Sequence, residues 1–194
     1  MGKIYYIIGK SSSGKDTIFK QLLAEKDLNL KNIVSYTTRP IRNGEQDGVE
    51  YYFVNEKVIE EARNNKKLIE LRSYNTCHGI WKYFTLEDHQ INLQNENYLM
   101  IGTLESFVHI RDYFGREAVL PVLIELDDGE RLQRALERER AQEIPKYEEM
   151  CRRFLADSED FSERKIVEAG IEKRFYNDNL DRCLDQIKEY MNHN

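Results

Sequence analysis

Apolar and polar positions along the chain form blocks that predict strands and helices in turn. Lys3–Ile8 is an apolar run that ends at Gly9, which predicts a buried strand. Over Lys15–Glu25 the apolar residues recur four apart, which predicts a helix. Tyr98–Ile101 and Val119–Ile124 predict two more buried strands. The first strand and helix are therefore joined by a short glycine-containing turn.

The rest of the chain continues this alternation. Short strands are expected at Ile33–Tyr36, Tyr51–Val54, Leu68–Leu71 and Lys82–Thr85. Helices are expected at Val58–Asn65, Gly129–Glu139, Tyr147–Ser158 and Leu180–Met191. Strands that alternate with helices predict an α/β fold, with a mostly parallel sheet covered by helices on both faces. Ligands of such sheets bind beyond the carboxyl ends of the strands.

Composition narrows the class of protein. A chain of 194 residues, 40% of them hydrophobic, can bury a core as one domain with an insertion. Its apolar runs fall short of the ~20 residues of a membrane span, and no signal peptide is expected. The net charge of −6 argues against a nucleic-acid partner. Three widely spaced cysteines fit no disulfide or zinc pattern, which indicates the cytoplasm. The oligomeric state stays open, and a homo-oligomer is possible.

The turn after the first strand is a phosphate-binding candidate. Residues 9–17 read Gly-Lys-Ser-Ser-Ser-Gly-Lys-Asp-Thr and fit G-x-x-x-x-G-K. Gly9 and Gly14 let backbone N–H groups surround a phosphate, the following helix adds its positive end, and Lys15 reaches the terminal phosphates. Asp16 stands where Ser or Thr is usual. Either Asp16 holds Mg²⁺, directly or through water, or it turns outward and Thr17 supplies the oxygen.

A second candidate for phosphate binding lies within residues 35–54. Arg39 and Arg42 are three residues apart and are flanked by hydroxyls and tyrosines. Such forked guanidinium groups suit a bound phosphate. The alternative is a polar loop whose charges are solvated.

Taken with the upstream loop, this segment resembles that of guanylate kinases. The matching positions are Ser35, residues 37–40, Arg42, residues 44–45, residues 47–48 and the aromatic strand 51–54. The whole chain also has the length of a bacterial member of that family. The resemblance implies a P-loop NTPase-type parallel sheet flanked by helices. It further implies a core of residues 1–34, 86–134 and 159–194, an acceptor-binding subdomain of residues 35–85 and a helical lid of residues 135–158.

The resemblance also implies an activity, the transfer of the γ-phosphoryl group of ATP to GMP with Mg²⁺. The ATP site would comprise Gly9, Ser11, Ser12, Ser13, Gly14, Lys15, Asp16, Thr17 and Asn177. The GMP site would comprise Ser35, Arg39, Arg42, Tyr51, Glu70, Tyr83, Thr85 and Thr103. Lys15 and the lid arginines Arg134, Arg138 and Arg153 would stabilise the transferred charge. Those arginines could also be a solvated helix end.

The proposed base site depends on Glu70 and departs from the family pattern in two places. A carboxylate at Glu70 accepts from N1–H and N2–H of guanine, whereas adenine presents a lone pair at N1. The family's Tyr-Gly-Ser/Thr reads Tyr83-Phe84-Thr85 here, after an apparent insertion over residues 77–81. Thr103 stands where an acidic residue is expected. Two alternatives stay open: a related kinase acting on a phosphorylated sugar such as a ribose bisphosphate, and a non-catalytic interaction module of the same fold.

Overall fold

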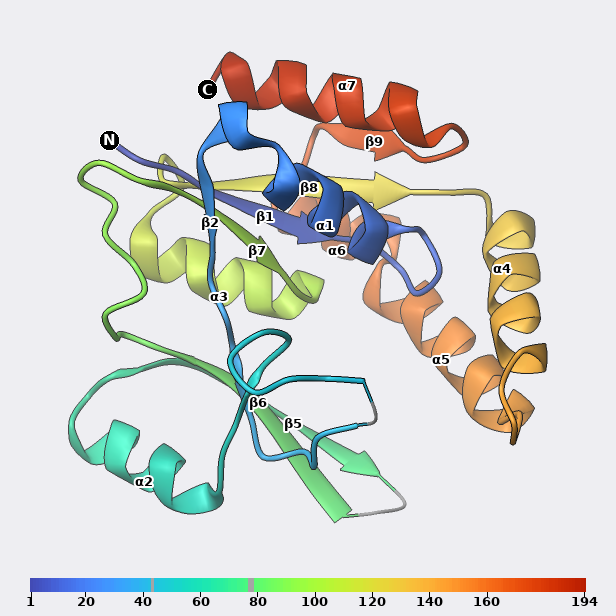
Figure 1. Cartoon of the computed structure of the whole chain (residues 1–194), viewed down its shortest axis with the longest axis horizontal. Helices are drawn as coiled ribbons and strands as arrows, with labels where there is room; N and C mark the ends of the chain where they lie inside the picture. The colour runs from blue at the N-terminus through green and yellow to red at the C-terminus, as the bar shows by residue number, and fades with distance from the viewer. Residues whose placement is uncertain (43, 77–78) are drawn as a thin grey trace.

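The centre of the protein is a five-stranded parallel sheet. The computed structural model describes residues 1–42, 44–76 and 79–194. The strand order is β2-β7-β1-β8-β9, and every pair in it is parallel. The strands are β1 (Ile4–Ile8), β2 (Leu30–Asn32), β7 (Asn97–Ile101), β8 (Val119–Glu125) and β9 (Arg174–Tyr176). Figure 1 shows this sheet in the upper half of the molecule.

Helices cover both faces of the sheet because β1 is apolar on both sides. Ile4, Tyr6 and Ile8 pack against α3 (Leu104–Phe114) and α6 (Glu163–Glu168). Tyr5 and Ile7 pack against α1 (Lys15–Ala24) and α7 (Leu180–Asn192). All five residues of β1 are buried, as expected for a central strand with helices on either side. In Figure 1, α7 and α3 lie on opposite sides of the sheet.

A second, four-stranded sheet lies below the first in Figure 1. Its order is β4-β3-β6-β5. The strands are β3 (Tyr36–Thr37), β4 (Tyr52–Phe53), β5 (Leu68–Thr76) and β6 (Gly79–Leu86), with α2 (Glu56–Asn64) between β4 and β5. β5 and β6 form a long antiparallel hairpin. Phe84 on β6 is fully buried and stacks on Tyr36 at a centroid distance of 5.4 Å.

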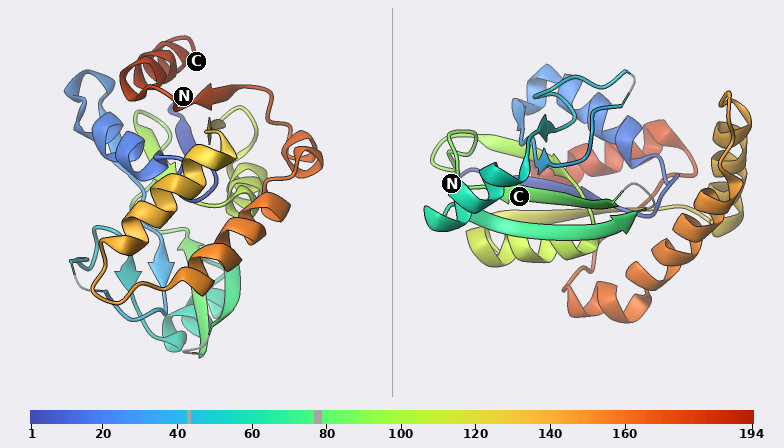
Figure 2. Two further views of the ribbon diagram at one scale, coloured as in Figure 1. Left: turned by 90° about the vertical axis from the view of Figure 1, so that its right-hand side faces the viewer. Right: turned by 90° about the horizontal axis from the view of Figure 1, so that it is seen from below.

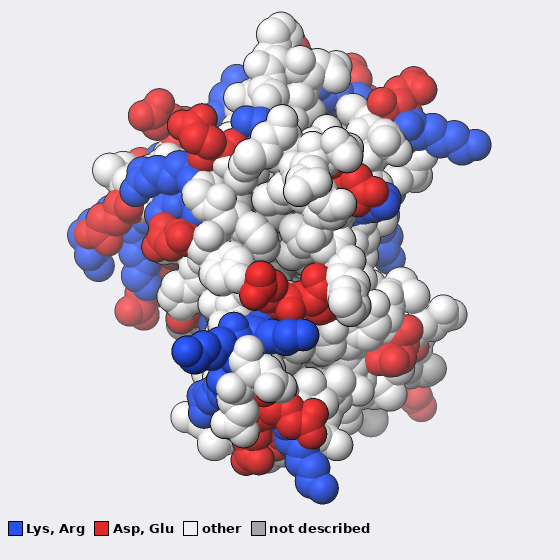
Figure 3. Space-filling model, turned by 90° about the vertical axis from the view of Figure 1, so that its left-hand side faces the viewer, with Lys and Arg blue, Asp and Glu red and all other residues white. Residues whose placement is uncertain are grey.

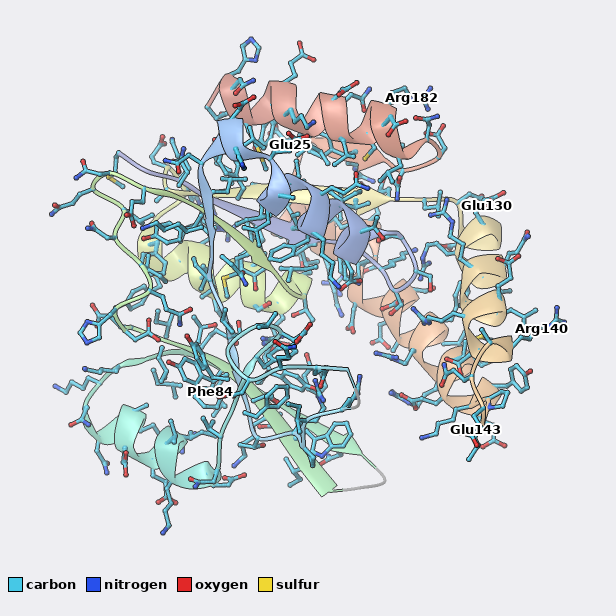
Figure 4. All side chains as sticks on the ribbon, viewed as in Figure 1. Glu25, Phe84, Glu130, Arg140, Glu143 and Arg182 are labelled. Atoms are coloured by element: carbon cyan, nitrogen blue, oxygen red, sulfur yellow. The ribbon has the colours of Figure 1, made fainter. Side chains whose placement is uncertain are left out.

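Two helices extend to one side of the central sheet. They are α4 (Asp128–Arg140) and α5 (Tyr147–Asp160), which pack against each other. Figure 2 shows them as a pair, and Figure 4 places Arg140 and Glu143 at the end of that pair away from the sheet. Glu130 lies at the other end, next to β8. The turn between β1 and α1 points toward this pair (Figure 1).

Most predicted elements are confirmed to within a few residues, but the strand expected at Ile33–Tyr36 is wrong. The strand β2 ends just before that stretch, residues 33–35 connect the two sheets, and Tyr36 begins β3. The strands β5 and β6 are longer than predicted. They contain the predicted strands Leu68–Leu71 and Lys82–Thr85 and extend beyond them. α3, α6, β9 and a short 3₁₀ helix, η1 (Lys26–Leu28), were not predicted.

The sequence predicts an insertion at residues 77–81, which the structure describes in part. Residues 77 and 78 lie outside the described residues, and Gly79–Trp81 begin β6. No helix in residues 1–42, 44–76 and 79–194 is long and apolar enough to span a membrane. On the face drawn in Figure 3, acidic and basic side chains are interspersed.

Candidate active site

The turn between β1 and α1 has the shape of a phosphate-binding loop. Gly14 has a φ of 87°, a left-handed conformation that favours glycine. A Cβ on Gly14 would lie 2.2 Å from Nδ2 of Asn177, whose amide donates to the Ser13 carbonyl at 2.8 Å. Gly14 caps α1 without a side-chain hydrogen bond, which leaves the first N–H groups of the helix open to an anion.

Two hydroxyls in this loop are buried without a partner among the described residues. They are Oγ of Ser12 and Oγ of Ser13. Ser12 also has a φ of 62°, which is strained for a residue with a side chain. Unpaired buried donors and local strain are features of ligand-binding sites. Both features support the prediction that this loop holds phosphates.

Lys15 and Asp16 lie at the start of α1, directly after the glycine-rich loop. Nζ of Lys15 lies 3.6 Å from Oδ2 of Asp16, whose side chain is 79% exposed. Burial raises the pKa of the Tyr51 hydroxyl, and the charges of Tyr83 and Asp16 act in the same direction. Asp16 is therefore within electrostatic reach of Tyr51, although Asp16 lies on α1 and Tyr51 directly precedes β4 of the second sheet. Thr17 is exposed beside Asp16.

The donor set around Asp16 fits a magnesium ion that keeps most of its water. No group of three or more His, Cys, Asp or Glu residues that could hold a metal occurs within the described part of the chain. Asp16 and Thr17 are exposed oxygen donors on the first turn of α1. Mg²⁺ bound by one or two protein oxygens takes its other ligands from water and phosphate. The structure thus leaves both readings of Asp16 open.

Arg39 is the buried cation of the acceptor segment. Its guanidinium donates to Glu45 at 2.9 and 2.8 Å, and lies 5.5 Å from the Tyr51 ring centroid. The Arg42 backbone N–H donates to Glu45 at 2.8 Å, and these donors lower the Glu45 pKa. Nε of Arg39 is buried without a partner among the described residues. Glu45 was not singled out as a site residue, although it belongs to the Gly-Glu turn that carried the resemblance.

The other predicted acceptor residues surround this cluster less tightly. The Tyr83 ring lies edge-on to Tyr51 with centroids 5.5 Å apart. Ser35 is buried, and its backbone carbonyl accepts from Tyr52 at 2.9 Å. Arg42 is exposed, with its guanidinium 5.9 Å from the centroid of a Trp81 ring.

Glu70 lies in a buried ion pair with Arg72. Nε and Nη2 of Arg72 donate to Oε2 and Oε1 of Glu70 at 2.8 and 3.2 Å. The Thr85 hydroxyl donates to Oε1 of Glu70 at 3.0 Å, and Nη1 of Arg72 donates to the Thr103 hydroxyl at 3.2 Å. Thr103 also caps α3, by accepting from the Ser106 N–H. Glu70, Thr85 and Thr103, which are predicted to contact the base, are thus brought together. They surround Arg72, which was not predicted as a site residue.

Only one of the three predicted lid arginines lies at the phosphate loop. Nη2 of Arg134 is 3.5 Å from the Asn177 carbonyl, beside Gly14. Arg138 is exposed, and Arg153 is exposed and 3.9 Å from Glu149. The structure therefore does not bring Arg138 and Arg153 to the loop.

An unpredicted cluster ties α4 and α5 to the loop. Arg131 is buried and donates to the Ser11 carbonyl and to Asp157, each at 3.0 Å. Asp157 also accepts from the Ser11 N–H at 2.7 Å. The spacing of arginines along α4 was visible in the sequence, but the partner Asp157 gave no signal.

Sequence similarity to known proteins extends along the chain. The sequence profile of the family described as guanylate kinase matches residues 1–87. The chain is 29% identical to the guanylate kinase of Porphyromonas gingivalis over 97% of this chain and 96% of that protein. It is 31% identical to that of Malacoplasma penetrans over 63% of this chain and 62% of that protein.

A solved structure bears on the fold. The crystal structure of guanylate kinase from Anaplasma phagocytophilum superposes with a TM-score of 0.67 at 20% identity, covering 99% of this chain and 85% of that one. The parallel sheet and the glycine-rich loop at the end of its central strand define an α/β protein of the P-loop type. The matching profile and relatives show that the chain is similar to guanylate kinases.

Proposed function

We propose that this chain is an ATP:GMP phosphotransferase, which moves the γ-phosphoryl group of ATP to the phosphate of GMP. One observation carries the proposal: Asp16 beside Lys15 is within electrostatic reach of Tyr51 beside Arg39. Two anion-binding sites this near to each other would suit two nucleotides placed phosphate to phosphate. Phosphoryl transfer needs this positioning, together with positive charge around the moving group.

The donor would bind at the glycine-rich loop. The loop amides and hydroxyls would hold the phosphates, and Lys15 would neutralise the terminal one. The loop contacts proposed for ATP are Gly9, Ser11, Ser12, Ser13, Gly14, Lys15, Asp16 and Thr17. Asn177 would border the adenine, beside Arg134. Mg²⁺, held by Asp16 or Thr17 through oxygen, would supply charge neutralisation at the phosphates.

The acceptor would bind against the second sheet. Arg39, Arg42, Tyr51 and Tyr83 would hold its phosphate, and the unpaired Nε of Arg39 supports this assignment. The base would lie against the buried cluster formed by Ser35, Glu70, Thr85 and Thr103.

The lid would complete the site by moving. In this proposal residues 135–158 form the lid, residues 35–85 the acceptor-binding subdomain, and the remainder the core. Arg134 already lies at the loop, whereas Arg138 and Arg153 would reach the transferred phosphoryl group on closure. Closure would also exclude water, which otherwise competes as the acceptor.

Product analysis by ³¹P NMR tests the proposal. ATP, GMP, Mg²⁺ and the protein should give ADP and GDP, and Lys15→Met should abolish the reaction. Lys20→Met is the matched control, because Lys20 is an exposed lysine on the same helix. Full activity in the Lys15 variant would contradict the assignment.

The alternatives predict different outcomes. Turnover of a ribose bisphosphate but not of GMP would indicate the sugar-phosphate kinase. Absence of ATP binding in calorimetry would indicate the non-catalytic module. We infer a cytoplasmic location, where ATP and GMP are available, and no nucleic-acid partner.

A further inference from the structure

Glu70 has almost no capacity left to bind a ligand. Its side chain is 0% exposed. Oε1 accepts from both Arg72 and Thr85, and Oε2 accepts from Arg72. A carboxylate oxygen offers two lone pairs, so one lone pair on Oε2 remains. A guanine whose N1–H and N2–H both seek this carboxylate could be satisfied only if the ion pair opened.

The guanidinium of Arg72, by contrast, has two N–H groups without an acceptor among the described residues. The edge formed by Nε and Nη2 faces Glu70, and a further N–H on Nη1 faces Thr103. An arginine carries five N–H groups, so two are left, one on Nη1 and one on Nη2. No atom in residues 1–42, 44–76 or 79–194 accepts from them. We call these two N–H groups, which lie on the terminal nitrogens of the planar fork, the free edge of Arg72.

This free edge borders the proposed acceptor site. Arg72 contacts Thr103 at the start of α3, while its partner Glu70 is bound by Thr85 on β6. The positive charges of Arg72 and Arg39 both oppose the rise that burial causes in the pKa of Tyr51. Both arginines therefore lie near one hydroxyl, Arg39 beside the proposed phosphate position and Arg72 beside Glu70.

We propose that Glu70 positions Arg72 and that Arg72 is the side chain that contacts the base. This inference rests on the proposed function and specifies its acceptor. The end of an arginine fork pairs with O6 and N7 of guanine, the commonest base-specific contact of arginine. Hypoxanthine presents the same two acceptors, whereas adenine presents an amino donor at position 6. The acceptors are therefore 6-oxopurine nucleoside monophosphates, with or without the 2-amino group.

The unmodified protein gives the first test. We expect kcat/KM for IMP to lie within about threefold of that for GMP. Both values should exceed kcat/KM for AMP by about 10- to 100-fold. Turnover of GMP with rejection of IMP would overturn this inference and leave the proposed function standing. Equal turnover of AMP would overturn it as well. No turnover of any of the three would overturn both.

A variant separates contact by Arg72 from contact by Glu70. Arg72→Met should lower kcat/KM for GMP and IMP by the same factor, about 10- to 100-fold and mainly through KM. The value of kcat/KM for AMP should not change. An increase in the ratio of kcat/KM for GMP to that for IMP would show that Glu70 contacts the base and would refute the inference. Arg111→Met is the matched control, because Arg111 is equally buried and bonds Asp112 and Ala169 outside the site. It should leave the acceptor ratios unchanged.

A second variant serves as a control for loss of stability. Arg72→Met leaves Glu70 as an unpaired buried charge, which can unfold a protein. The double variant Glu70→Leu, Arg72→Met removes both charges. We expect it to lower kcat/KM for GMP and IMP by the same factor as Arg72→Met does. Retention of GMP preference over AMP in the folded double variant would refute the inference.

Discussion

Replacing Arg131 with methionine should destabilise the protein and weaken ATP binding. The Arg131 side chain is 1% exposed and donates to the Ser11 carbonyl at 3.0 Å and to Asp157 at 3.0 Å. It also pairs with Asp128 and lies 4.9 Å from the centroid of the Phe154 ring. One side chain thus joins the phosphate loop to both α4 and α5, so its loss should loosen the loop that is proposed to hold ATP.

The expected loss of stability follows from the burial of the two carboxylates that pair with Arg131. Removing one member of a buried ion pair costs about 3–5 kcal/mol, because the other charge is left unpaired. Asp128 is 52% exposed and Asp157 is 17% exposed, so water solvates part of the remaining charge. We therefore expect the lower end, about 3 kcal/mol. For a chain of 194 residues this lowers Tm by about 6–12 °C.

Thermal unfolding followed by circular dichroism measures this loss. Arg138→Met is the control: Arg138 is exposed on the same helix and has no hydrogen bond or ion pair in the described part of the chain. Its free energy of unfolding should change by less than about 0.5 kcal/mol. A fall of less than about 2 °C for Arg131→Met, or an equal fall for both variants, would refute the reasoning.

Three more predictions concern the two binding sites. Gly14→Ala should abolish ATP binding in calorimetry, because the new Cβ would lie 2.2 Å from Asn177 Nδ2 at a φ of 87°; unchanged affinity would contradict the close fit. The Glu45 pKa lies below its usual 4.5 because Arg39 donates to it, so the pair stabilises the protein above about pH 4.5 and is lost as pH falls through the lower folded-state value. Urea denaturation should therefore show Glu45→Gln less stable than the wild type at neutral pH, with a difference that shrinks as pH falls below 4.5; a difference that does not change with pH would refute this. Arg138→Ala should lower kcat by about 10³-fold with an unchanged Tm, and a normal kcat would remove Arg138 from the lid mechanism.

The sequence predicted the parallel sheet and the phosphate loop because their signals are local. A strand buried on both faces is a continuous apolar run, as in Ile4–Ile8, and the loop is a short motif at the end of that run. The helix α3 escaped prediction although Thr103 and Ser106 form a capping box at its start. Ser replaces the usual Glu or Gln in that box, and Thr103 was assigned to the base instead.

The missed site residues have partners far away in the chain. Ser11 and Asp157 are 146 positions apart, and Arg72 and Thr103 are 31 apart. Neither hydrophobic periodicity nor motif spacing contains such pairs, because the folding of the two sheets creates them. The resemblance located Glu70, and the structure pairs it with Arg72.

The central claim is that two nucleotide phosphates meet between Lys15 and Arg39. A crystal structure with a non-hydrolysable ATP analogue, Mg²⁺ and GMP tests this most directly. We predict the terminal phosphate of the analogue at Lys15 and the GMP phosphate at Arg39 and Tyr51, with the two phosphates adjacent. GMP bound elsewhere, with residues 35–54 out of reach of its phosphate, would contradict it.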